Sequence, residues 1–179
     1  MAERVFGEIE GVEEGALFDD RRALSTAGVH RPIQAGISGS ATDGADSIVL
    51  SGGYEDDEDY GTVVVYSGHG GRDPNTGQQT SDQTFTKQNA ALGKNKVLGL
   101  PVRVVRGHQM DSPFAPERGY RYDGLYWVDE YWEESGRSRY KVWRFRLRKN
   151  DDRHPPQPRP GAEPPNIPEH GRNDNRLND

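Results

Sequence analysis

The chain has 179 residues, enough for one compact domain with its own core and too few for two domains of ordinary size. Hydrophobic residues make up 31% of it, and the 22 glycines and 12 prolines favour a fold rich in strands and turns over a helix bundle. The net charge of -6 argues against a protein that coats nucleic acid without selectivity, and the absence of cysteine excludes disulfides, cysteine-ligated zinc and thiol nucleophiles.

Five short segments predict β-strands, because they are rich in β-branched and aromatic residues and several alternate apolar with charged positions. In chain order they are residues 48–50, 62–66, 100–105, 125–132 and 140–148. Glycine and proline residues lie between these segments and indicate turns and loops.

Residues 80–95 are different and predict a helix with its N-cap at Thr80 or Ser81 and its end at Gly93. Three side chains of this segment fall on one helical face: Phe85, Asn89 and Leu92. One helix among at least five strands predicts an α+β, predominantly β fold built on a mixed or closed antiparallel sheet.

From residue 151 onward, prolines and charges leave almost nothing to bury, so we predict a folded domain over residues 1–150 and a Pro-rich, disordered tail over residues 151–179. Three interpretations of this tail are compatible with the sequence: a linker to a further domain, a partner-binding arm and a simple overhang.

The charge is unevenly distributed: residues 43–59 carry only negative charges, whereas residues 101–150 have a basic balance. A basic face on an acidic protein is therefore compatible with the sequence. The N-terminus lacks the apolar segment of a signal peptide, and no run approaches membrane-spanning length. The sequence thus predicts a soluble intracellular protein with no membrane partner.

No hydrolytic site is predicted. The common metal-dependent nucleases need an acid two positions before a lysine, and none of the lysines has one. The five histidines form neither a helical i, i+4 pair nor a His-x-Glu motif. We therefore expect no catalytic residue, no metal site and no cofactor.

The acidic run at residues 55–59 resembles a calcium loop in its alternation, but an EF-hand needs glycine at the sixth position, where Tyr60 stands, with Gly61 one place late. A solvated acidic turn is the simpler interpretation for four of its residues: Glu55, Asp56, Glu58 and Asp59. The flanking Tyr54 and Tyr66, taken alone, are typical of core aromatics at strand ends.

A series of segments then follows in a distinctive order: FGEIEGVEEGALF, STAGVHRPIQAGISGSATDGADSIVLSGGYEDD, VVVYSGHGGRD, SDQTFTKQNAAL, PVRVVRG, YRYDGLYWVDEYW and VWRFRLRKN. Together they resemble the SRA (SET and RING associated) or YDG domain over residues 6–150, and Tyr122-Asp123-Gly124 is the triplet behind the second name. The resemblance implies a curved PUA-like β-barrel with one or two short helices. The chain resembles a bacterial-type member of this family. We predict no fused HNH, SET or RING module within it.

The resemblance further implies a reader of 5-methylcytosine in double-stranded DNA, which flips the modified base into a pocket. Tyr54 and Tyr66 match the two aromatics that sandwich the base, and Asp57 matches the carboxylate that reads its Watson–Crick edge. The wall of the pocket is assigned to Gly53, Ser67 and Gly68.

Physical chemistry supports these roles. Stacking is worth roughly 1 to 3 kcal/mol per base, which offsets much of the few kcal/mol that flipping costs. A carboxylate accepts from the N4 amine of cytosine and is repelled by O4 of thymine. The methyl group adds only about 0.8 kcal/mol, so preference over cytosine should be real and limited.

Gln34 matches the thumb residue that fills the space left by the flipped base, with a plain surface loop as an equally weighted alternative. The finger loop corresponds to Thr76, Gly77, Gln78 and Gln79, where vertebrate members carry an Asn-Lys-Arg. Phosphate contacts are assigned to Arg72, Arg103 and Arg106, with Arg144 and Arg146 as further candidates, although alternating arginines on a strand are equally typical of a solvated face.

The sequence therefore predicts a methylcytosine reader that is not itself an enzyme, with little preference for sequence context or hemimethylation. The first alternative is the targeting part of a modification-dependent restriction system, whose nuclease lies on a separate chain or elsewhere in the polypeptide. The second is a PUA-like RNA binder. We expect a cytoplasmic, nucleoid-associated protein, or a nuclear one in a eukaryote.

Overall fold

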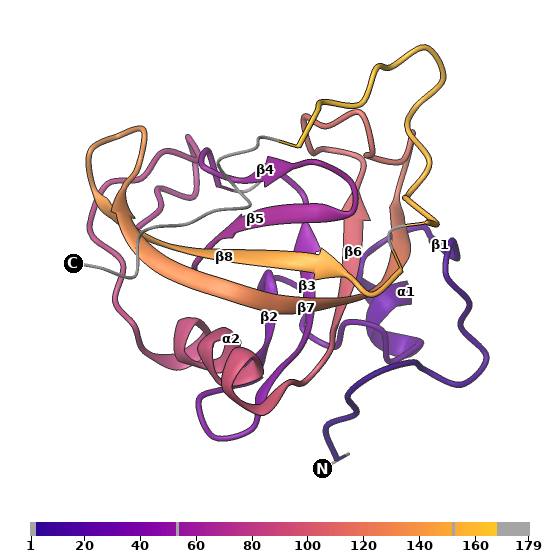
Figure 1. Cartoon of the computed structure of the whole chain (residues 1–179), viewed down its shortest axis with the longest axis horizontal. Helices are drawn as coiled ribbons and strands as arrows, with labels where there is room; N and C mark the ends of the chain where they lie inside the picture. Colours follow the sequence, from indigo (N-terminus) through magenta and orange to yellow (C-terminus); the bar gives the residue numbers. More distant parts are fainter. Residues whose placement is uncertain (1–2, 53, 152, 168–179) are drawn as a thin grey trace.

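The structure, a computed structural model, describes residues 3–52, 54–151 and 153–167. The elements in this part of the chain are β1 (Leu17–Phe18), α1 (Arg21–Thr26), β2 (Ile37–Ser40), β3 (Gly44–Leu50), β4 (Glu58–Asp59), β5 (Val63–Ser67), α2 (Lys87–Leu98), β6 (Val102–Gly107), β7 (Tyr120–Ser135) and β8 (Lys141–Lys149). One sheet runs in the order β2-β3-β6-β7-β8-β5-β4, and β1 pairs with β7 (Figure 1). The pairing of β3 with β6 is parallel, and the other pairs in this sheet are antiparallel.

The sheet curves because its longest strand, β7, pairs with β6 through its first half and with β8 through its second half. The register shifts once in each pairing, between Arg103 and Val105 of β6 and between Val128 and Glu130 of β7. Such irregularities bend a strand and increase its twist. Figure 1 shows β7 and β8 sweeping together along one side of the molecule, with α2 lying against β2, β3 and β7.

The main core lies between the curved sheet and α2. It includes Ile48, Val104, Tyr126 and Leu147 from the strands and Leu92 from the helix, all fully buried. A second, smaller core lies under α1 and is made of Leu24, Val29, Val49, Val105 and Tyr122. The predicted fold class is confirmed: the domain is predominantly β, with two helices in the described residues, and has the curved PUA-like architecture.

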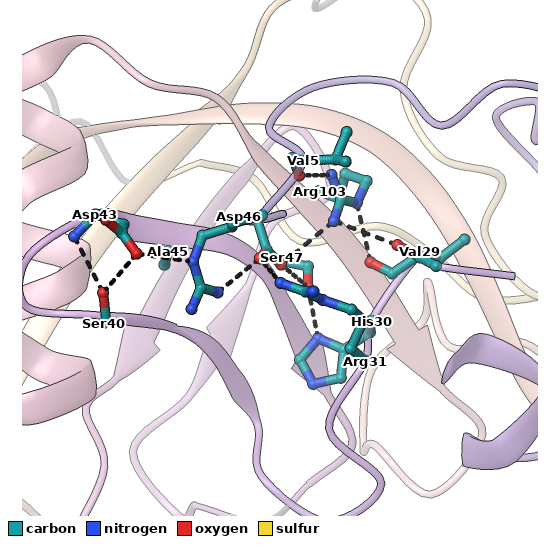
Figure 2. Close-up of polar contacts among 12 residues, drawn as sticks. Val5, Val29, His30, Arg31, Ser40, Asp43, Ala45, Asp46, Ser47 and Arg103 are labelled. Atoms are coloured by element: carbon teal, nitrogen blue, oxygen red, sulfur yellow. Dashed lines mark hydrogen bonds and ion pairs between the residues drawn. The ribbon is translucent and has the colours of Figure 1, made fainter. Parts of the chain in front are cut away.

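The five predicted strands are present as β3, β5, β6, β7 and β8, with their ends shifted by a few residues. Sequence reasoning missed β1, β2 and β4, which have two to four residues each and are too short to show a periodicity. It also began β3 too late, because the first half of that strand carries Asp46 and Ser47. Both are buried in a polar network with His30 and Arg103, shown in Figure 2.

The predicted helix exists, but both of its predicted ends are wrong. It begins at Lys87 after Thr86 and ends at Gly99, whose left-handed backbone (φ 66°) closes the last turn. Gly93 lies inside the helix, where a Cβ atom would come within 2.5 Å of the Phe85 ring. Gly93 therefore leaves room for the Phe85 ring to pack against the helix, and it does not end the helix.

The described part of the predicted tail, residues 153–167, contacts the folded domain. This segment has no helix or strand, but Arg159 binds the main domain: its backbone N–H donates to Pro113 O (2.6 Å) and its guanidinium donates to Ala115 O (2.9 Å). Pro156 is buried. Residues 168–179 lie outside the described residues, so the prediction of disorder is not addressed there.

Candidate nucleic-acid interface

The inner aromatic wall of the candidate site is Tyr66, near the end of β5. The strand places it opposite Phe145 of β8, and its side chain is only 2% exposed. Its hydroxyl lies against Gly36, where a Cβ atom would come within 2.6 Å of the phenol oxygen. Burial and the neighbouring Asp57 hold the pKa of Tyr66 well above its usual value, so the phenol is neutral.

The outer aromatic wall is Tyr54, which is held from two sides. Its hydroxyl accepts a hydrogen bond from the Gly70 N–H (3.0 Å), and the Arg72 guanidinium lies over its ring, 5.2 Å from the centroid. The loop that carries Tyr54 leaves β3 through Gly52, which has a positive φ of 77°. Gly53, which sequence reasoning assigned to the pocket wall, lies outside the described residues.

Asp57 bridges the Tyr54 loop to the end of β5. Its Oδ1 accepts a hydrogen bond from the Ser67 N–H (2.7 Å), and its own N–H donates to Tyr54 O (3.4 Å). Burial raises the pKa of Asp57 to about 7, against the opposing effects of the Ser67 amide and of Arg144. The carboxyl group is thus poised between its neutral and charged forms at physiological pH.

Several predicted site residues meet around one cavity of about 120 Å³. Its lining consists of Gln34, Ala35, Gly36, Ile37, Tyr54, Tyr66, His69 and Arg72. The structure therefore brings together the predicted thumb residue, both predicted stacking tyrosines and one predicted phosphate contact. Asp57 stands next to this cavity through its bond to Ser67, which follows Tyr66 directly.

Sequence reasoning missed the two amides that fix the pocket wall, Gln83 and Asn89. Gln83 donates to Gly68 O (2.7 Å) and accepts from the Trp143 N–H (2.9 Å). Asn89 accepts from the His69 N–H (2.6 Å) and donates to His69 O (2.9 Å). A signal was available, since a polar Asn89 had been placed on the same helical face as Leu92. A buried polar side chain requires partners.

The finger loop is partly different from the prediction. Thr76 and Gln78 are exposed, and the loop closes on itself through the Gly77 N–H donating to Asp73 O (2.9 Å) and the Asp73 N–H donating to Gln78 O (2.8 Å). Gln79 is only 4% exposed and donates to Gly70 O (2.8 Å) and Ser81 O (3.0 Å). Its assignment as an exposed finger residue is therefore wrong, because its amide is needed to satisfy backbone carbonyls.

The assignment of Arg103 and Arg106 to phosphate contact is also wrong. Arg103 is 1% exposed and donates to Val29 O (2.9 Å) while pairing with Asp46 (3.3 Å), as Figure 2 shows. Arg106 is fully buried and its guanidinium pairs with Asp59 (2.8 Å). Each arginine is directed toward a buried carboxylate, Asp46 for Arg103 and Asp59 for Arg106.

The same ion pairs correct the interpretation of the acidic run. Asp59 is 9% exposed, and although burial would raise its pKa, Arg106 holds the pKa below its usual value. Asp56 is 5% exposed and accepts from the Arg137 N–H (2.9 Å) in the β7–β8 connection. These two carboxylates are structural, and the other residues of the run, Glu55, Asp57 and Glu58, are partly exposed.

The further arginine candidates on β8 are engaged as well. Arg144 pairs with Glu58 (2.7 Å) and Glu134 (3.0 Å), and Arg146 pairs with Asp129 (2.9 Å). Among the sequence-predicted cations, Arg72 is the one that lines the cavity. A second cavity of about 200 Å³, which shares His69 with the first, adds Lys87 at the start of α2.

The described part of the chain contains no group of three or more His, Asp or Glu side chains that could hold a metal ion. Within the same residues, neither helix has the length and apolar character needed to cross a membrane.

The chain belongs to the SAD/SRA domain family, whose sequence profile matches residues 5–153. It is 43% identical to the E3 ubiquitin-protein ligase UHRF1 of Danio rerio over 88% of this chain, and it spans 23% of that protein's length. The modification dependent TagI restriction endonuclease is 46% identical, with a TM-score of 0.81 over 85% of this chain and 54% of that chain. The SUVH5 SRA domain in complex with methylated CHH DNA is 39% identical, with a TM-score of 0.68 over 81% of this chain and 93% of the other.

Proposed function

We propose that this chain binds double-stranded DNA containing 5-methylcytosine and receives the flipped base between Tyr54 and Tyr66. The observation that carries the proposal is the cavity lined by both tyrosines, Gln34 and Arg72, with the Asp57 carboxyl beside it. Family membership and the complex of the related SUVH5 SRA domain with methylated CHH DNA support it. We assign binding, not catalysis, to these residues.

Asp57 reads the base edge. The Ser67 N–H fixes Oδ1, which orients the carboxyl group and leaves Oδ2 to accept from the N4 amine of cytosine. Because the pKa of Asp57 is about 7, the group can also present a proton to N3 of cytosine. Thymine presents an acceptor at O4 in place of the N4 amine, so it is repelled there by the ionised carboxylate.

The remaining roles follow from placement. Gln34 is exposed at the rim of the cavity and has the donors and acceptors to bond the orphaned guanine. Arg72 and Lys87 line adjoining cavities and supply positive charge for phosphate groups. The finger loop between Asp73 and Gln78 carries no cation, so it should contribute little readout of the neighbouring bases.

A second candidate is favoured by the similarity to the TagI restriction endonuclease. In this case the domain would direct a nuclease, on a separate chain or elsewhere in the polypeptide, to modified DNA. Binding of methylated DNA is common to both candidates. We expect the protein to act where its DNA lies, in a nucleoid or a nucleus.

The test is a competition titration of one protein preparation against methylated duplex, unmethylated duplex and double-stranded RNA at one salt concentration. Fluorescence of 2-aminopurine beside the modified base reports flipping. We expect preference for the methylated duplex and a fluorescence rise. Equal affinity for the three nucleic acids would refute the proposal, and binding without a fluorescence rise would refute flipping.

Asp57→Asn is the informative variant, because an amide keeps an acceptor for the Ser67 N–H but turns a donor toward the base. Asp56 is unsuitable as a control, since its carboxylate supports the β7–β8 connection. The matched control is Asp111→Asn, which removes the same charge from an exposed position. Selectivity for the methylated duplex should disappear in the Asp57→Asn variant only.

A cleavage assay separates the two candidate functions. Methylated plasmid is incubated with the protein and added magnesium or manganese, with and without cell extract.

A further inference from the structure

The loop that carries the proposed thumb residue, residues 31–36 (the thumb loop), is held far more firmly than its exposure suggests. Its tip is exposed, with Ile33 52% accessible and Gln34 beside it. An exposed loop of this kind usually samples many conformations, and ordering it on binding costs free energy. Here the loop backbone is fixed before DNA arrives.

Arg21, the first residue of α1, makes the main contacts. Its guanidinium donates to three carbonyl oxygens of the thumb loop: Pro32 O (2.9 Å), Gln34 O (3.5 Å) and Ala35 O (2.5 Å). A planar guanidinium suits this task because it presents several N–H groups in a fixed fork. Two of the acceptors, Pro32 O and Ala35 O, flank Gln34, and the third is the carbonyl of Gln34 itself.

His30 and Ser25 hold the same loop at further points. The His30 ring lies 2.8 Å from Ala35 O through Nε2, and the Ser25 hydroxyl donates to Arg31 O (2.7 Å). Burial lowers the pKa of His30 to about 4, so the ring is neutral and its Nε2 proton faces the carbonyl. On its other side His30 meets Ser47 (2.7 Å) in the buried network around Asp46 (Figure 2).

The thumb loop also joins the pocket directly. Gly36 touches the Tyr66 hydroxyl and accepts from the Val49 N–H of β3 (2.8 Å). At Gly36 the thumb loop is therefore tied to β3 and to the inner stacking ring by contacts that do not involve Arg21, whereas Arg21 holds the part of the loop around Gln34.

We propose that Arg21 is a positioning residue for base flipping, which holds the thumb loop so that Gln34 stands ready to enter the duplex when the base leaves. This inference rests on the proposed function. Arg21 acts through the backbone of the thumb loop and needs no contact with DNA. Loss of the fork should leave the pocket intact. The thumb loop would then lose conformational entropy when it becomes ordered on DNA binding, and affinity would fall.

The test compares Arg21→Met with Arg22→Met. Both remove one arginine charge at adjacent positions of α1, but Arg22 is exposed and no contact holds it to the thumb loop in the described residues. Each variant is titrated against two duplexes: one with guanine opposite the methylcytosine, and one with an abasic site opposite it. The second duplex has no base pair to open and no orphaned guanine for Gln34 to bond.

We expect Arg21→Met to bind the guanine duplex about tenfold more weakly than wild type and the abasic duplex within about twofold. Arg22→Met should weaken both duplexes equally and slightly. Arg21→Lys, which keeps the charge without the fork, should fall between them on the guanine duplex only. Combining Arg21→Met with Gln34→Ala should cost no more than Gln34→Ala alone.

Equal losses on both duplexes for Arg21→Met would overturn the proposal, since they would indicate a phosphate contact or a general loss of structure. So would identical behaviour of Arg21→Met and Arg22→Met. If Arg21→Met does not fold, as judged by thermal unfolding, Arg21→Lys decides by the same two-duplex comparison. A wild-type protein that shows no flipping signal on either duplex would contradict the proposed function itself, which is a distinguishable result.

Discussion

Asp57 and Asp59 stand two positions apart in the same acidic run, residues 55–59, and have opposite surroundings. Asp57 lies next to the cavity, accepts a hydrogen bond from the Ser67 amide and has its pKa raised to about 7 by burial. Asp59 is turned inward to Arg106 and Ser112, and its pKa is held below the usual value despite burial. A buried carboxyl that is paired with a cation stabilises the fold. A carboxyl that accepts only from a backbone amide still has an oxygen free to bond a ligand. Under the proposed function, this difference separates an acid that stabilises the fold from an acid that reads the base.

The largest expected effect lies on the structural side. Arg106→Leu leaves Asp59 and Asp123 buried without their shared cation, so it should lower the free energy of unfolding by about 3 to 5 kcal/mol. The matched variant is Arg72→Leu at the cavity, which should change stability little and weaken DNA binding. Urea denaturation of both checks this. Similar stability losses would erase the distinction between the two regions.

Tyr66→Ala tests the pocket side of the comparison. It removes one stacking face, so methylated DNA binding should weaken by roughly 1 to 3 kcal/mol. Tyr66→Phe keeps the ring, and should lose much less, because the hydroxyl packs on Gly36 and does not stack. Isothermal titration on a methylated duplex measures both. A Phe variant as weak as the Ala variant would mean that the hydroxyl, not the ring, contributes the binding energy.

Proton linkage separates the two acids without any DNA. The pKa of Asp57 in the native state, about 7, exceeds the unfolded value of 3.8, so the native state binds more protons between these pH values. The contribution of this group to stability is therefore lost as pH rises through that window. Asp59 has the opposite sign: its contribution is present above the unfolded pKa and is lost as pH falls through its lowered native pKa.

The measurement is urea unfolding at about pH 5 and about pH 8 for wild type and Asp57→Asn. The wild type should lose more stability than the variant between the two conditions. Other titrating groups, including His69, are common to both proteins and cancel in the difference. A pH dependence that is the same in both would show that Asp57 is ionised throughout.

These regions also show what the sequence could predict. The strands followed from alternation, and the positions of Tyr54, Asp57 and Tyr66 followed from the resemblance to the family; the structure places both rings at one cavity. Alternation left the arginines of β6 as either phosphate contacts or a solvated face, and it could not show that they meet Asp46 and Asp59, which are distant in sequence. Such pairings depend on tertiary contacts. The same holds for Gln79, whose partner carbonyls are defined only once the loop has folded.

The smallest expected effect concerns the finger loop. Reading the neighbouring pair or the opposite strand needs side chains that reach base edges in the major groove, where arginine and asparagine are the most capable. Between Asp73 and Gln78 the loop carries no cation, and Asn75 is its one exposed residue of these two types, beside Thr76 and Gln78. Its backbone is closed by its own hydrogen bonds, so docking of the loop on DNA should cost little entropy but also gain few contacts.

We therefore expect the affinities for methylcytosine in CG, CHG and CHH contexts to agree within a few-fold, with little preference for hemimethylated CG. Gln78→Ala should change the affinity by less than about twofold. Competition titration across these duplexes at one salt concentration measures the differences. A preference for hemimethylated CG of about tenfold or more, equivalent to about 1.4 kcal/mol, would show that this loop reads the second strand despite its composition.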